Sequence, residues 1–203
     1  ETGPRGIRIR NNFGTSMAMS GDGRVLVVGS TGYKTERGAA YVLEQNSDGG
    51  QWLLSHRIAS SAPEPHAFFG FKLAIDFSGE ILAVGADGED KYRGSVYLYE
   101  RRLGQNEQSL TNCGIKVFGE ASHFGCPTRL EAPERASEDN YGGSLALSGD
   151  GKFLAVGSPG KKSNEESDHG AVYLYQKSFA QNSSIISEWI PSGIDFLGVP
   201  HSQ

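Results

Sequence analysis

The chain has 203 residues, of which 37% are hydrophobic and 21% charged, and its formal net charge is −5. This composition is typical of a globular protein with one large or two small domains, and its mild acidity offers no electrostatic footprint for nucleic acid. No apolar run approaches the length that spans a bilayer, and two cysteines are too few for a disulfide scaffold.

The first residues do not belong to the pattern that follows. Residues 1–3 lack a starting Met and resemble the remnant of a secretion vector, so we expect the natural protein to pass through the secretory pathway. The rest of residues 1–12 contains the short apolar stretch Ile7-Arg8-Ile9, which we interpret as a possible outer strand of a neighbouring structural unit.

One sequence pattern then occurs three times. Each copy opens with an aromatic residue and a glycine, at Phe13-Gly14, Phe69-Gly70 and Tyr141-Gly142. In every copy, a second apolar run ends 16 positions after that aromatic residue, at Gly29, Gly85 and Gly157. Because the register agrees across the copies, we divide the chain into repeats at residues 13–68, 69–140 and 141–203.

Each copy predicts antiparallel β-strands in the same order. In the first copy, Ser20-Gly21-Asp22-Gly23 separates two apolar runs, and this is a hairpin signal because Gly and Asp tolerate positive φ. Short runs rich in β-branched residues, such as residues 25–28, suit strands that are buried on both faces. A third run follows at residues 38–43, and weaker fourth strands are expected at residues 52–58, 128–131 and 187–190.

Four-stranded units with this spacing are typical of β-propeller blades. We therefore predict an all-β fold of three blades, with Ala18, Ala74 and Ala146 on the innermost strands, where small side chains fit near the axis. A β-solenoid or a sandwich is the alternative, which the length of the hairpin-built unit makes less favourable.

The aromatic-Gly openings are followed by Gly-Ser-Thr, Gly-Ala-Asp and Gly-Ser-Pro at residues 29–31, 85–87 and 157–159. These motifs resemble FG-GAP repeats, which build the β-propeller of integrin alpha subunits and of related extracellular proteins. The resemblance implies a non-enzymatic protein-interaction or adhesion module, secreted or at the cell surface, with ligand-binding loops on a propeller face. The alternatives are a structural part of a multi-chain surface complex and the non-catalytic propeller of a secreted hydrolase.

Three blades are fewer than the four to eight with which propellers typically close. Two unpaired edges would favour aggregation, so we expect further blades, a second copy of the chain or another chain to complete the ring. A protein ligand or partner subunits are thus the expected partners, with no nucleic acid and no membrane span in this chain.

Integrin propellers carry calcium loops between the first two strands of several blades. Here the corresponding turns at residues 20–23, 78–80 and 148–151 hold one carboxylate each, whereas calcium needs six to eight oxygens. The acidic residues 87–90 and 165–168 also lack the spacing of a calcium loop, so we expect no cofactor. No nucleophile motif or phosphate loop points to catalysis.

By resemblance to integrins, the loops between the second and third strands are candidates for ligand binding. They combine tyrosines with charges of both signs, as protein-recognition surfaces do. The candidate residues are Tyr33, Lys34, Arg37, Asp87, Glu89, Asp90, Lys91, Tyr92, Arg93, Lys161, Lys162, Glu165, Asp168 and His169.

The second copy is longer than the first, and its extra residues lie at about residues 104–127. This insertion holds Cys113 and Cys126, for which a secreted chain favours a local disulfide over free thiols or bonds to other chains. The triplet Asn182-Ser183-Ser184 is a candidate N-glycosylation site.

Overall fold

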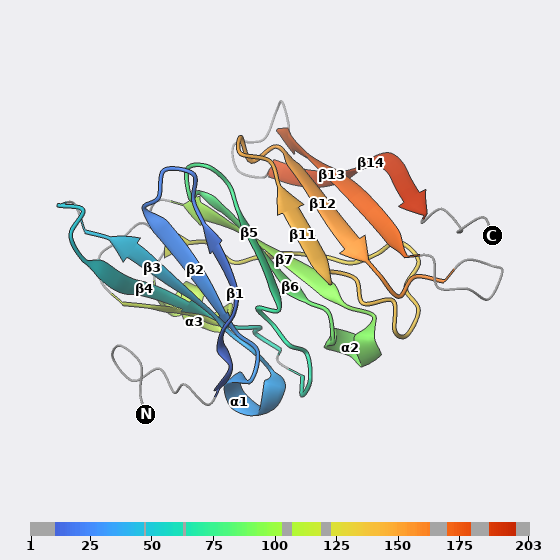
Figure 1. The fold of residues 1–203 in the computed structure, drawn as a ribbon, viewed down its shortest axis with the longest axis horizontal. Coiled ribbons are helices and arrows are strands. Elements are labelled where there is room, and N and C mark those ends of the chain that lie inside the picture. Colours follow the sequence, from blue (N-terminus) through green and yellow to red (C-terminus); the bar gives the residue numbers. More distant parts are fainter. Residues whose placement is uncertain are drawn as a thin grey trace.

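The computed structural model describes residues 11–46, 48–62, 64–102, 107–118, 123–162, 170–179 and 187–197. Its strands form three antiparallel sheets that lie side by side in chain order (Figure 1). The fold is all-β, and the three sheets are the propeller blades that the repeat predicts. No helix within the described ranges is long and apolar enough to cross a membrane.

Blade 1 is a five-stranded sheet. Its first four strands follow the chain, as β1 (Phe13–Met19), β2 (Val25–Ser30), β3 (Ala40–Gln45) and β4 (Trp52–Ile58). The fifth strand, β8 (Ile115–Val117), comes from the insertion and pairs with β4.

Blade 2 contains β5 (Lys72–Ile75), β6 (Ile81–Ala86), β7 (Ser95–Arg102) and β10 (Thr128–Leu130). The short β9 (His123–Phe124) also pairs with β7. Blade 3 contains β11 (Ser144–Leu147), β12 (Phe153–Ser158), β13 (Ala171–Phe179) and β14 (Ser187–Leu197).

The hairpin turns after the first strands use their own carboxylates. Asp22 accepts hydrogen bonds from the Ser20 hydroxyl at 2.6 Å and from the Arg24 amide at 3.0 Å. The Ser20 hydrogen bond is the main reason why the pKa of Asp22 lies below its usual value. Asp150 closes the equivalent turn of blade 3 with the Ser148 hydroxyl in the same way. These carboxylates therefore stabilise tight turns.

The loops between the second and third strands of blades 1 and 2 each contain one short turn of helix, α1 (Tyr33–Glu36) and α2 (Glu89–Tyr92). Neither is an ordinary helix, because three successive residues of each have positive φ: Lys34, Thr35 and Glu36 in α1, and Asp90, Lys91 and Tyr92 in α2. Both turns lie at the same edge of the molecule, the lower edge in Figure 1.

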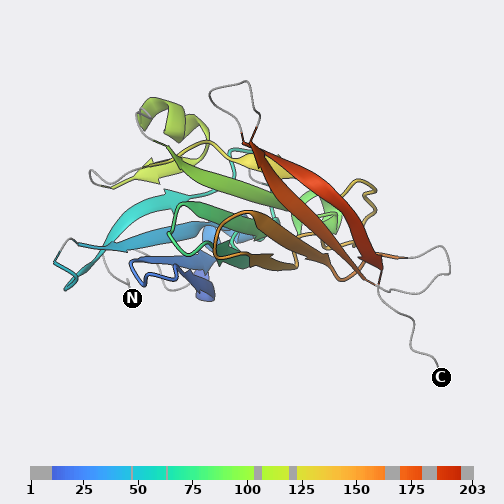
Figure 2. The same ribbon diagram turned by 90° about the horizontal axis from the view of Figure 1, so that it is seen from above.

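The insertion after β7 folds back over blade 1. It contains the one longer helix of the described residues, α3 (Glu107–Asn112), where no helical periodicity is visible in the sequence. Figure 2 shows α3 on the side of the molecule away from β1. The expected disulfide joins Cys113 to Cys126, with Cα atoms 5.4 Å apart.

The two large hydrophobic cores lie between adjacent blades, and a smaller cluster around Tyr41 lies within blade 1. One core joins Val25, Val27 and Val42 of blade 1 to residues of blade 2 such as Val84 and Tyr99. A second core joins blades 2 and 3 in the same manner. Burial of apolar area therefore holds each blade to its neighbour, and a blade without a neighbour leaves one face of its sheet open to water.

Candidate functional site

The opening aromatic-Gly of each repeat forms the junction with the preceding blade. Phe69 is fully buried, and its backbone forms a parallel bridge with Gly38 of blade 1. Its amide donates to the Arg37 carbonyl at 3.1 Å. A Cβ on Gly38 would overlap the backbone of Phe69, so only glycine permits this approach.

The junction between blades 2 and 3 repeats this geometry. Tyr141 is fully buried and bridges Gly94, while its amide donates to the Arg93 carbonyl at 3.2 Å. A Cβ on Gly94 would again overlap the backbone of Tyr141. At both junctions the opening aromatic residue therefore pairs with the glycine that precedes the third strand of the preceding blade.

Comparison with known families supports this reading of the repeat. Residues 127–175, from β10 into β13, match the sequence model of the FG-GAP repeat family. The chain contains an FG-GAP repeat. The match covers the last strand of blade 2 and most of blade 3, and the other copies share its sequence register. No curated protein matches the chain at the significance required.

The outward face of blade 1 has no described neighbour. Met17 is 67% exposed and Met19 54% exposed, whereas the residues at the same positions of blade 2, Leu73 and Ile75, pack against the core between blades 1 and 2. No described atom lies within 4 Å of a Cβ built on Gly14.

The third blade is also exposed, on the face that contacts the following blade in blades 1 and 2. Phe153 is 48% exposed and Val172 38% exposed, although the residues at both positions are buried in blades 1 and 2. Gly170 corresponds to Gly38 and Gly94, yet a Cβ on Gly170 would meet only residues of its own blade among the described parts of the chain. Among the described residues, no aromatic-Gly pair of a following blade therefore contacts Gly170.

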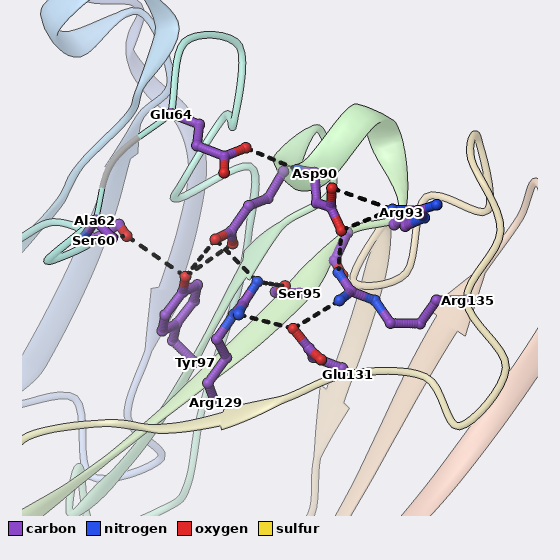
Figure 3. A network of polar contacts seen from close by, with 12 residues as sticks. Ser60, Ala62, Glu64, Asp90, Arg93, Ser95, Tyr97, Arg129, Glu131 and Arg135 are labelled. Atoms are coloured by element: carbon purple, nitrogen blue, oxygen red, sulfur yellow. Dashed lines mark hydrogen bonds and ion pairs between the residues drawn. The ribbon is translucent and has the colours of Figure 1, made fainter.

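The loop of blade 2 holds a connected set of ion pairs (Figure 3). The carboxylate of Glu89 accepts the Tyr97 hydroxyl at 2.8 Å and Nη2 of Arg129 at 3.1 Å. Nη1 of Arg129 pairs with Glu131 at 2.8 Å, and Arg135 also pairs with Glu131 at 2.9 Å.

The same network continues to the tip of α2. Asp90 pairs with Arg93 at 3.2 Å and with Arg135 at 3.4 Å. Its amide donates to the Glu64 carboxylate at 3.1 Å. Hydrogen bonding to Arg93 holds the pKa of Asp90 below its usual value. Three carboxylates and three arginines therefore neutralise one another in this loop.

Burial shifts the ionisable groups beneath α2. It raises the pKa of Glu89, an effect that the Tyr97 hydrogen bond and Arg129 oppose. It also raises the pKa of Tyr97 to about 12, with the Glu89 carboxylate adding to the shift. The pKa of Asp87 is raised to about 6 by burial, and its Oδ1 is buried without a hydrogen-bond partner.

The loop of blade 1 is arranged differently. Tyr33, Lys34 and Arg37 line a pocket of about 340 Å³ together with Arg57 from β4 and Lys116 from β8. Of these pocket residues, sequence reasoning selected the three in the loop and missed Arg57 and Lys116. Only the folding of the insertion onto β4 brings Lys116 to this place.

The remaining candidate residues are distributed as follows. In blade 3, Nζ of Lys161 binds the Glu134 carbonyl at 2.6 Å and lies 3.4 Å from the buried Asp139 carboxylate. Lys91 and Tyr92 are exposed at the tip of α2, and Lys162 is exposed beside Lys161. Glu165, Asp168, His169 and the sequon residue Asn182 lie outside the described residues.

The acidic segment of blade 2 does not converge on a common point. Glu89 and Asp90 bind separate arginines, as the contacts above show. In the ranges that the structure describes, no group of three or more His, Cys, Asp or Glu side chains could hold a metal ion.

Proposed function

We propose that this protein is an extracellular, non-enzymatic protein-interaction module whose end blades each bind a further FG-GAP blade. One observation carries the proposal: equivalent positions are buried or partly buried at both internal junctions and exposed at both ends. Met17 and Met19 are exposed at one end, and Phe153 and Val172 at the other. Apolar side chains exposed on a sheet face that is covered in the equivalent blades mark a site of protein interaction.

The two ends are complementary to each other. The free Phe13-Gly14 has the sequence that docks at the internal junctions, and the free Gly170 is the position that receives it. A second copy, another chain or further blades of the same polypeptide could each supply this contact. Two copies would give six blades, within the range in which propellers close.

Light scattering tests this proposal on the chain itself. We expect a mass that rises with concentration from 21.8 kDa towards twice that value. The variants Met17→Asp and Phe153→Asp should reduce association, because each buries a charge in the new junction. Leu53→Asp is the matched control, since Leu53 is 41% exposed on the outer strand β4.

A monomer of 21.8 kDa at all concentrations, with a cooperative thermal transition, would contradict self-association through these faces. Equal masses for the Met17→Asp, Phe153→Asp and Leu53→Asp variants would also contradict it. In that case three blades suffice for a stable fold.

Ligand binding by the loop face is the second candidate function. It is favoured by the position of α1 and α2, which lie at the same edge of neighbouring blades (Figure 1). Loops on a rigid β-scaffold are the usual place for recognition. An integrin-like adhesion role would use this face.

A further inference from the structure

The loops of blades 1 and 2 share one register but differ in charge. Arg57 lies opposite Tyr41 in the first sheet, and Arg129 lies opposite Tyr97 in the second. Arg37 and Arg93 likewise hold the same position before the junction glycine. The two blades therefore present the same pair of arginines on the same backbone frame.

The acidic partners of these arginines occur only in blade 2. The positions of Glu89, Asp90 and Glu131 are occupied in blade 1 by Tyr33, Lys34 and Ala59. Two of these changes remove a carboxylate, and the third replaces it with a cation. Arg37 and Arg57 of blade 1 therefore lack the carboxylates that neutralise Arg93 and Arg129 in blade 2.

Among the described residues, no carboxylate takes the place of Glu89, Asp90 and Glu131 beside the arginines of blade 1. The Arg57 guanidinium lies 5.3 Å from the Tyr33 ring, and Lys34 Nζ lies 5.6 Å from the same ring. Nε of Arg37 and Nε of Arg57 are buried without a hydrogen-bond partner, as is Nε of Arg93 in blade 2, so the two blades differ in their ion pairs. Within the described residues, neither arginine pairs with a carboxylate.

These groups surround a cavity. The pocket of about 340 Å³ is lined on one side by α1 and β4 and on the other by the end of α3 and β8. Lys116 contributes a fourth positive charge from β8, which pairs with β4. The pocket thus concentrates cations in a chain whose net charge is −5.

We propose that this pocket binds the phosphate or sulfate group of a small oxyanionic ligand. Guanidinium groups bind such oxyanions through paired N–H donors, and lysines add charge. A divalent oxyanion compensates for more of the three missing carboxylates than one carboxylate ligand would. The cavity is large enough for an organic part attached to the anion, since ligand pockets commonly begin at about 300 Å³.

This proposal goes beyond the assembly of blades. The pocket is formed by one chain, but it lies on the outward face of blade 1, because Met17, Tyr41, Arg57 and Lys116 share one face of the sheet. A further blade bound to this face would cover the pocket. Anion binding is therefore measured at concentrations at which light scattering shows a monomer, where the failure of either proposal leaves the other standing.

The test is a titration of isotope-labelled protein with inorganic phosphate and, separately, inorganic sulfate, followed by NMR at constant ionic strength. We expect saturable shifts of the amide signals of Lys34, Gly38 and Lys116, and none for the equivalent Asp90 and Gly94. Tighter binding of phosphate would identify a phosphate ester as the ligand class, and tighter binding of sulfate a sulfate ester.

Variants based on blade 2 sharpen the test. Ala59→Glu restores the position of Glu131 and should weaken anion binding by at least about tenfold, because the new carboxylate occupies Arg57. Ala59→Gln is the control of the same size without the charge, and it should retain binding. Lys116→Gln, at an exposed position, should also weaken binding, whereas Lys91→Gln in the α2 loop should not.

Two results would overturn the proposal. One is a set of shifts that grows linearly with phosphate, sulfate and chloride alike, which indicates screening without a site. The other is equal affinity of Ala59→Glu, Ala59→Gln and Lys116→Gln for the anion, measured by calorimetry on variants with unchanged NMR spectra elsewhere.

Discussion

Blades 1 and 2 share one backbone plan and differ in what surrounds it. Blade 2 lies between two neighbours, with Phe69 buried at its entrance and its loop charges balanced by Glu89 and Glu131. Blade 1 has a half-exposed Phe13 and a loop whose arginines lack those partners. The repeat therefore specifies the sheet, whereas a few substitutions in its loops decide which blade is available for binding.

The opening aromatic residues are the most direct way to test this difference. Phe69→Ala should lower the free energy of unfolding by about 4 kcal/mol, because a fully buried ring is removed from a junction. Phe13→Ala should cost about 1 kcal/mol, since Phe13 packs on Tyr41 from one side only. Urea unfolding measures both, and equal losses would show that Phe13 is buried against a further blade.

Substitution of Asp87 in blade 2 should have a smaller effect on the free energy of unfolding, and that effect should depend on pH. Its pKa is about 6 in the folded protein and near 3.8 otherwise, so the native state binds the proton more tightly. Stability from this group is therefore present at low pH and is lost as the pH rises from about 4 to about 6. Asp87→Asn should raise stability at pH 7.5 by about 2 kcal/mol.

That gain should shrink as the pH falls below 6 and vanish below about pH 3, where the Asp87 carboxyl is neutral in the folded and the unfolded state. Chemical unfolding at several pH values measures this dependence. A constant difference between Asp87→Asn and the parent protein across this range would show that the carboxyl is not desolvated as described.

Substitution of the equivalent residues Arg129 and Arg57 should change the free energy of unfolding least, and in opposite directions. Arg129→Gln breaks ion pairs with Glu89 and Glu131 and should cost about 1 kcal/mol, a modest value because Arg129 is 41% exposed. Arg57→Gln removes a cation that no carboxylate of the described residues balances, and should leave stability unchanged or raise it by up to about 1 kcal/mol in phosphate-free buffer. Equal destabilisation by both variants would contradict the charge comparison between the blades.

Much of the scaffold could be derived from residue patterns. The shared spacing of Phe13, Phe69 and Tyr141, with hairpin turns and β-branched runs after each, predicts four strands in each sheet, since these signals are local. The additional strands of blades 1 and 2, β8 and β9, come from the insertion and do not follow from the repeat. The expected disulfide between Cys113 and Cys126 is present as well. The sequence also draws attention to Tyr33, Lys34 and Arg37, because they lie in a loop between two recognisable strands.

The tertiary structure alone decided which charges meet. Arg57 and Lys116 lie far apart in the chain and reach one pocket because β8 of the insertion adds to β4, a pairing that no local pattern encodes. Whether an arginine is neutralised depends on carboxylates from other loops, as the ion pair between Arg129 and Glu89 shows. Local sequence therefore determined the strands and turns through backbone preference and hydrophobic spacing, whereas burial and electrostatics at the loops emerged only when distant segments came together.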